Sequence, residues 1–256
     1  MGRPAPLWGP LQVPERQVRH RQIRRRRLWI RNETDRWLYA TDLDGSRTVE
    51  AISSEARKPD TLPWNSIIGI SNESAKLLPA LPDQPVLLKS SHPVQILPAA
   101  RLKLVLAVPI WIQLSGTVTV FDLETDPLSR TWFGDPLAGE SAYALSIEDW
   151  TVREEEQPGG GYVQVPLEIV NASQELLSFQ RLLVRVVHLS LFGAGDLLFT
   201  NDVSVTFRSV NQYSQVSFSG SSSLEPGGSA LLQEPRQSVS GNLIRRSFLF
   251  FRNLTE

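Results

Sequence analysis

The side chains best suited to chemistry gather in one short stretch of the chain, residues 129–143. An indole, two carboxylates and a phenol occur there close together, among glycines that favour turns. Aromatic and acidic groups on a loop of a rigid scaffold are typical of ligand-binding sites. The sequence therefore predicts a binding site whose candidate residues are Trp132, Asp135, Glu140 and Tyr143.

The same stretch has two other interpretations. If its two acids and Tyr143 surround a closed pocket together with His188, the chain would be an enzyme with acid–base groups. If the stretch is structural, Trp132 packs into one end of the fold as an aromatic plug. For Trp132 we expect the structural role, with Gly134 permitting the turn that follows it.

A second candidate site is a run of arginines. Eight arginines lie within Arg16–Arg31 with no acidic residue among them. Residues 1–40 carry ten arginines and three acids, so the remainder has a net charge of −8 although the total is −1. Clustered guanidinium groups attract phosphate, either in nucleic acid or on an anionic membrane surface. Arg24 and Arg26 are therefore candidate binding residues for either partner.

A structural role for this run is the interpretation that we favour. Leu28-Trp29-Ile30 follows the run directly and is typical of a strand that enters a core. Arginine stems cover apolar surface well, and arginines on an edge strand prevent edge-to-edge association. No recognised nucleic-acid-binding module accompanies the run. We expect these side chains to lie on acidic or apolar surface of the same chain.

Other reactive groups are scarce. Cysteine is absent, which excludes disulfides, thiolate metal sites and cysteine nucleophiles. The three histidines lie far apart, so no zinc-binding spacing exists, and no phosphate-binding glycine loop or serine nucleophile elbow occurs. Asp44-Gly45 between the predicted strands Arg36–Ala40 and Arg47–Ala51 predicts a hairpin turn. The sequence thus predicts no catalytic residue, no metal and no cofactor.

The elements that position these residues are predicted to be strands. Twelve of the 18 prolines fall between Pro59 and Pro166, and proline breaks helices. Apolar residues alternate with polar ones along Tyr162–Ile169, as in a half-buried strand. Ser115-Gly116 predicts a hairpin between Ile110–Leu114 and the segment after it. We therefore predict an all-β fold, an antiparallel β-sandwich with a smaller N-terminal β-rich subdomain.

The sequence also predicts the structure of three further segments. Pro158–Gly161 would close a hairpin between Ser146–Arg153 and the strand that follows. Leu182–Leu191 is apolar on both faces and predicts a central strand containing His188. Residues 242–254 place apolar side chains at helical spacing, which favours a short C-terminal helix.

The predicted organisation has three parts. Residues 1–83 form the N-terminal subdomain with the arginine-rich segment, and residues 84–219 form the sandwich. Residues 220–256 comprise a Ser/Gly/Pro-rich linker and a C-terminal segment. The longest apolar run, Leu104–Ile112, is far shorter than a membrane-spanning helix, and no signal peptide is recognisable. These features predict a cytoplasmic protein.

Several stretches along nearly the whole chain resemble the uncharacterised prokaryotic family called domain of unknown function 432. The matching stretches are Gly9-Pro10-Leu11, Leu28–Arg31, Leu78–Val86, Val108–Ile112, Leu128–Asp135, Gly139-Glu140, Tyr143–Leu145 and Val187–Leu191. The resemblance implies no assigned reaction, cofactor or catalytic residue. Genes of this family often lie near those of mechanosensitive channels, so a channel is an implied associate by gene neighbourhood alone.

The expected function is therefore a non-catalytic cytoplasmic binding or accessory β-sandwich protein, whose partner could be another protein. One alternative is attachment to nucleic acid or an anionic membrane through Arg16–Arg31. The other is an enzyme with an unrecognised acidic and aromatic pocket in residues 129–143.

Overall fold

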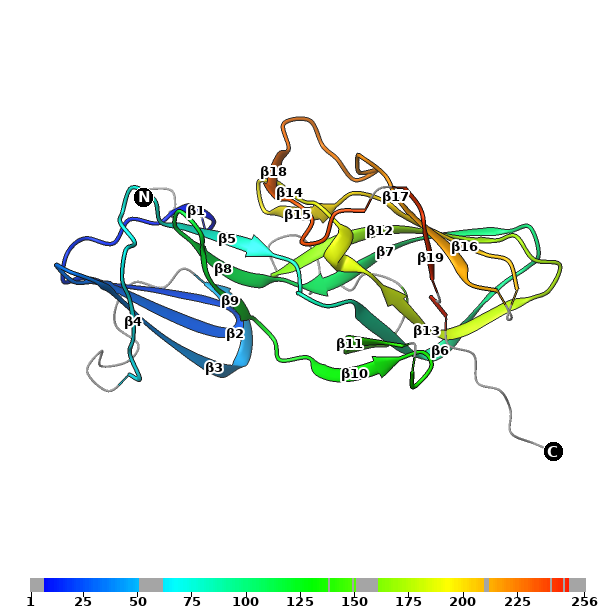
Figure 1. The fold of residues 1–256 in the computed structure, drawn as a ribbon, viewed down its shortest axis with the longest axis horizontal. Helices are drawn as coiled ribbons and strands as arrows, with labels where there is room; N and C mark the ends of the chain where they lie inside the picture. Colours follow the sequence, from blue (N-terminus) through cyan, green and yellow to red (C-terminus); the bar gives the residue numbers. More distant parts are fainter. Residues whose placement is uncertain are drawn as a thin grey trace. The chain divides into compact units, whose positions relative to one another are not determined.

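Strands are the main secondary structure of the described residues (Figure 1). A computed structural model describes residues 7–50, 62–137, 139–148, 150, 161–209, 212–239, 241–245 and 247–248, with the backbone alone for 44–50. No α-helix occurs among these residues, and one 3-10 turn spans Val186–His188. The all-β class predicted from proline content and alternation is confirmed.

The chain forms two compact units, each built from non-consecutive segments. The first comprises the chain up to Ala80, then Pro109–Pro127 and Gly159–Gly161. The second comprises Leu81–Val108, Leu128–Pro158 and the chain from Tyr162 onwards. The predicted division followed chain order, with boundaries after residues 83 and 219, whereas these units interleave in the sequence.

The first unit contains two antiparallel sheets. One has the order β2-β3-β4, with β2 at Val18–Asn32, β3 at Trp37–Glu50 and β4 at Asn65–Ile67. The other has the order β1-β5-β8-β9, with β1 at Gly9–Pro10, β5 at Lys76–Ala80, β8 at Trp111–Ser115 and β9 at Thr119–Glu124. The β8–β9 pair confirms the hairpin predicted at Ser115-Gly116.

The long hairpin β2–β3 differs from the prediction. Its turn lies at Glu33–Arg36, where the Glu33 amide donates to the Arg36 carbonyl at 2.8 Å. The hairpin predicted at Asp44-Gly45 is wrong, because β3 continues past both residues. The register with β2 shifts there, and Thr48–Glu50 pair again with β2, ending at Gln22 opposite Glu50. The paired partner strand outweighs the local turn preference. Ala51, the last residue of the predicted second strand, lies outside the described residues.

The second unit contains two further sheets. A four-stranded sheet has the order β10-β11-β6-β13, with β6 at Val86–Ile96, β10 at Ser129–Phe133, β11 at Glu140–Ile147 and β13 at Leu177–Val184. The eight-stranded sheet runs β18-β14-β15-β12-β16-β17-β19, and β7 also pairs with β12. Its strands are β7 (Arg101–Pro109), β12 (Tyr162–Asn171), β14 (Leu191–Ala194), β15 (Leu197–Thr200), β16 (Val203–Phe207), β17 (Ser214–Phe218), β18 (Ala230–Gln233) and β19 (Leu243–Arg245).

The core of the second unit follows the period of two. Along β12, Val163, Val165, Leu167 and Ile169 are buried, as the alternation predicts. Of the strand Ser146–Arg153 predicted to pair with β12, Ser146 and Ile147 belong to β11, which lies in a different sheet from β12. The rest of this predicted hairpin, including its turn before Gly161, lies largely outside the described residues. Alternation therefore identified strands but did not identify their partners.

Two other predicted elements are replaced. The expected strand Leu182–Leu191 ends at Val184, and His188 lies in the 3-10 turn, because Arg185 turns inward and its carbonyl accepts from the His188 amide at 3.1 Å. Moreover, β13 lies at a sheet edge and not at its centre. The expected C-terminal helix is absent from the described residues up to Phe248, and Leu243–Arg245 instead pairs as β19 with the open edge of β17.

Candidate functional site

The loop between β10 and β11 is a tight turn organised by Asp135. The Asp135 carbonyl accepts from the Gly139 amide at 2.7 Å and from the Trp132 Nε1 at 2.9 Å. The Asp135 Oδ1 accepts from the Leu137 amide at 2.9 Å. Gly134 has a φ of 103°, a left-handed conformation that favours glycine. The turn predicted from Gly134 is present, and it holds the Trp132 indole in one place.

Trp132 does not form the predicted plug. Its side chain is 52% exposed, whereas that of Phe133, the next residue along β10, is 1% exposed. Phe133 packs with Leu87, Ala142 and Leu183. Neighbouring side chains on a strand point to opposite faces, so only one of two adjacent aromatic residues can enter the core. Phenylalanine, which has no polar atom to satisfy, occupies the inner face.

The other candidate residues of this stretch, Glu140 and Tyr143, bind different partners within the chain. The buried Tyr143 donates from its hydroxyl to the Asp83 Oδ1 at 2.9 Å. Glu140 forms an ion pair with Arg185 at 2.5 Å, and the Arg185 side chain is only 3% exposed. Tyr143 and Glu140 thus stabilise the fold locally. Glu140 and Asp135 line one hollow, but Tyr143 does not line it.

The predicted fourth member of an enzyme site, His188, is engaged elsewhere. Its Nδ1 donates to the Gln237 carbonyl at 2.9 Å, and its ring packs against Phe218 with centroids 5.5 Å apart. Phe218 belongs to the eight-stranded sheet, whereas Asp135 and Glu140 follow and begin strands of the four-stranded sheet. The described geometry does not assemble the acid–base group that the enzyme alternative requires.

Charged and apolar side chains surround a hollow of about 250 Å³ beside this loop. Phe133, Asp135 and Glu140 line it together with Tyr213, Ile244 and Arg245 from the region of β17 and β19. Leu137, at the tip of the loop, is 98% exposed. We call this region the β10 surface, defined by Arg130, Trp132, Leu137, Tyr213, Ile244 and Arg245. Sequence reasoning could not find Tyr213, Ile244 or Arg245, since they lie far from the loop in the chain.

The arginine run forms most of β2, and its two candidate residues face their own chain. Arg24 donates from Nε to the Asp126 Oδ2 at 2.9 Å, and its Nη2 donates to the same oxygen. Arg26 donates from Nε to the Glu124 carbonyl at 2.8 Å. Burial lowers the pKa of Arg26, while Glu124 and Asp42 oppose that change. These contacts match the structural interpretation that we favoured for both residues.

Arg24 lies at an irregularity of the strand. Its φ is 53°, and the register between β2 and β3 shifts between Arg24 and Arg26. A β-bulge re-aims a side chain, here towards Asp126 at the end of the β9 hairpin. Since the Arg24 side chain is only 3% exposed, an external phosphate cannot reach it in this conformation. Arg16 and Arg19, by contrast, are exposed.

His20 on the same strand is buried and stacks on Trp29, with ring centroids 4.8 Å apart. Burial, together with the charges of Arg27 and Arg21, lowers the pKa of His20 to about 4. Between pH 6.5 and 4 the unfolded chain therefore binds a proton at His20 that the folded chain does not bind.

We accordingly expect folding stability to fall as the pH drops from 6.5 towards 4, by up to about 1.4 kcal/mol per pH unit from this residue. Urea unfolding at several pH values, for the wild type and for His20→Phe, measures this contribution. The phenyl ring keeps the stacking on Trp29 but cannot titrate. An identical pH dependence in both proteins would contradict the prediction.

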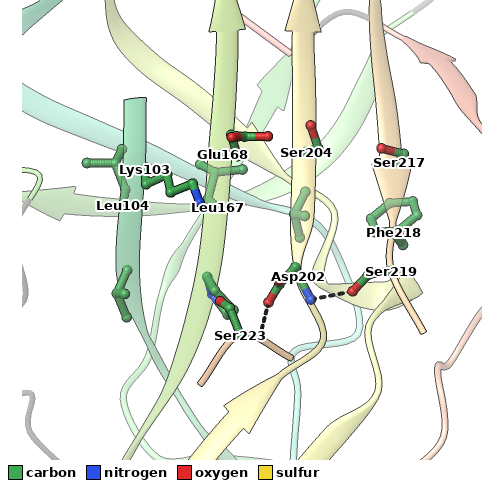
Figure 2. A pocket seen from close by; sticks show the side chains of 13 residues that line it. Lys103, Leu104, Leu167, Glu168, Asp202, Ser204, Ser217, Phe218, Ser219 and Ser223 are labelled. Atoms are coloured by element: carbon green, nitrogen blue, oxygen red, sulfur yellow. Dashed lines mark hydrogen bonds between the residues drawn. The ribbon is translucent and has the colours of Figure 1, made fainter. Parts of the chain in front are cut away.

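A larger hollow lies elsewhere, on the eight-stranded sheet. A groove of about 510 Å³ is lined by residues of β7, β12, β16 and β17 (Figure 2). Its polar lining consists of Lys103, Glu168, Asp202, Ser204, Ser217, Ser219 and Ser223. None of these residues was a sequence-based candidate, because single serines and charges on alternating strands carry no motif.

Comparisons with known proteins place the chain without assigning an activity. A family model described as "Protein of unknown function (DUF432)" matches residues 7–252. No curated protein and no solved structure matches the chain. Within the described part of the chain, no helix has the length and hydropathy of a membrane span.

Proposed function

We propose that this chain, which belongs to the DUF432 family of proteins of unknown function, is a non-catalytic binding module that docks an extended, acidic polypeptide segment. The docking site is the β10 surface. The observation that carries the proposal is that the exposed Tyr213 and Ile244 line one hollow with Asp135, whose carbonyl holds the exposed Trp132 indole beside it. The cytoplasmic setting expected from the sequence belongs to the same proposal.

The side chains of the β10 surface are those that dominate protein–protein binding. Trp, Tyr and Arg are enriched among the residues whose truncation weakens complexes most. The hydrogen bond from Trp132 to the Asp135 carbonyl fixes the indole before a partner arrives, which reduces the entropy lost on binding. Leu137 offers further apolar area at the loop tip.

The open edge of β10 favours an extended partner. In the order β10-β11-β6-β13, the first strand has β11 on one side and no described strand on the other. An unpaired edge presents amide and carbonyl groups that an added strand can bind. A docked segment would place alternate side chains beside Arg130 and Trp132, which share the outward face of β10.

The charge of the surface favours an acidic partner. Arg130 and Arg245 form no ion pair among the described residues. The nearby Glu140 is already paired with Arg185. The Asp135 carboxylate accepts from the Leu137 amide, and the two arginines outnumber it among the charges available to a partner. Complementary charges increase both specificity and association rate.

The test uses two labelled synthetic peptides, one alternating Val with Glu and the other alternating Val with Lys. We expect the acidic peptide to bind at least tenfold more tightly at low salt. Trp132→Ala should weaken that binding by about tenfold or more, as for a residue at the centre of an interface. Leu97→Ala, which removes an exposed apolar side chain outside the β10 surface, is the matched control and should change nothing.

Two results would overturn the proposal. Equal binding of both peptides, or no binding of either, would remove the charge and edge arguments. Binding to anionic phospholipid vesicles that Trp132→Ala abolishes, with no peptide binding, would assign the surface to a membrane instead.

A further inference from the structure

The groove on the eight-stranded sheet is a second site, independent of the β10 surface. It lies across four strands that are neighbours in the sheet, in the order β7, β12, β16 and β17 (Figure 2). Its volume of about 510 Å³ is within the range of small-molecule sites in proteins. A sheet face that is hollowed to this size can enclose a compact ligand.

The polar groups of the groove form a regular row. Glu168 on β12 is the register partner of Ser204 on β16, and Ser204 is the register partner of Ser217 on β17. Register partners share a face of the sheet, and adjacent strands lie about 4.8 Å apart. The row therefore presents a carboxylate and two hydroxyls at intervals similar to those between hydroxyls across a six-membered sugar ring.

One end of the groove is held in place by a second set of serines. The Asp202 Oδ1 accepts from the Ser223 amide at 2.7 Å, and the Asp202 amide donates to the Ser219 Oγ at 3.0 Å (Figure 2). Asn201 donates from Nδ2 to the Ser219 carbonyl at 2.8 Å. The serine-rich segment, expected from its composition to be a linker, thus closes this end of the site.

The charges of the groove nearly cancel. Lys103 supplies one positive charge, and Glu168 and Asp202 supply two negative charges. Arg101 lies 3.7 Å from Glu168 and offsets one of them. A site without excess positive charge does not favour a phosphate or a polyanion. Serine hydroxyls both donate and accept, which matches a ligand whose own groups are hydroxyls.

Apolar side chains complete the lining. Leu104, Pro166 and Val203 contribute hydrocarbon between the polar groups. A ligand that fits this lining carries hydroxyls at its edge and C–H groups on its face. We infer that the groove binds a neutral sugar of mono- or disaccharide size, with Ser204, Ser217 and Glu168 as the recognising side chains.

The experiment measures binding of glucose, N-acetylglucosamine and maltose to the full chain by saturation-transfer NMR and calorimetry. Glucose 6-phosphate is the anionic comparison. We expect at least one neutral sugar to bind, and the double variant Ser204→Val/Ser217→Val to weaken it at least tenfold through two lost hydrogen bonds. Thr206→Val is the matched control, since Thr206 lies on the same face of β16 but does not line the groove.

Other results would contradict the inference. If no neutral sugar binds, the ligand class is wrong. If glucose 6-phosphate binds more tightly and Lys103→Met abolishes its binding, the groove is an anion site. If the serine variants bind sugar as the wild type does, the sugar lies elsewhere. Parallel assays of Trp132→Ala keep this site distinguishable from the β10 surface, because that change should leave sugar binding unaltered.

Discussion

Replacing Asp126 with alanine is expected to lower the free energy of unfolding by about 3–5 kcal/mol, the usual effect of breaking a buried ion pair from one side. The side chains of Arg24 and Asp126 are only 3% and 11% exposed. Removal of the carboxylate leaves a guanidinium inside the first unit without the group that accepts both its Nε and its Nη2. Urea unfolding of wild type and Asp126→Ala measures the difference.

Two further variants separate the ion pair from packing. The double variant Arg24→Met/Asp126→Leu removes both charges but keeps the volume of the side chains, so it should be markedly more stable than Asp126→Ala. Arg26→Gln is the control on the same strand, since Arg26 is less buried and donates to a carbonyl and not to a carboxylate. A loss below about 1 kcal/mol for Asp126→Ala would show that water relieves the buried charge.

Truncation of the adjacent aromatic residues Phe133 and Trp132 should affect folding stability very differently. Phe133→Ala should destabilise the protein by about 3–5 kcal/mol, because it opens a cavity against Leu87, Ala142 and Leu183. Trp132→Ala should change stability by no more than about 0.5 kcal/mol, as for an exposed residue. The comparison is made by chemical denaturation of the two single variants.

The pair also links stability to function. Under the proposed function, Trp132→Ala loses binding of the acidic peptide while its unfolding midpoint stays that of the wild type. A large loss of stability in Trp132→Ala would instead support the buried plug that the sequence predicted for this residue. If Phe133→Ala were as stable as the wild type, the burial of its side chain would be in error.

The arginine run shows what local sequence can and cannot reveal. Its composition favoured both a phosphate-binding face and a structural strand, and charge density alone does not separate them. The position of Asp126, 102 residues along the chain, decides what Arg24 contacts. A bulge with positive φ at Arg24 then turns that side chain towards its partner. Neither feature leaves a signal near the run.

The all-β class, the β8–β9 hairpin and the family of the chain were readable from the sequence by itself. The fold class depends on local properties, since proline opposes helices and a period of two requires strands. The hairpin depends on a turn between neighbouring segments, and membership of the family depends on the order of short motifs. None of these inferences requires knowledge of which distant segments meet.

Only the tertiary structure decided which strands pair and which face of each strand is inside. A period of two separates the side chains of a strand into two faces, but the packed neighbours determine which face is buried. For this reason Phe133 lies in the core and Trp132 on the surface, although both are large aromatic residues and neighbours in the sequence. The groove depends on the same choice, because Glu168, Ser204 and Ser217 become neighbours only when β12, β16 and β17 pair in register.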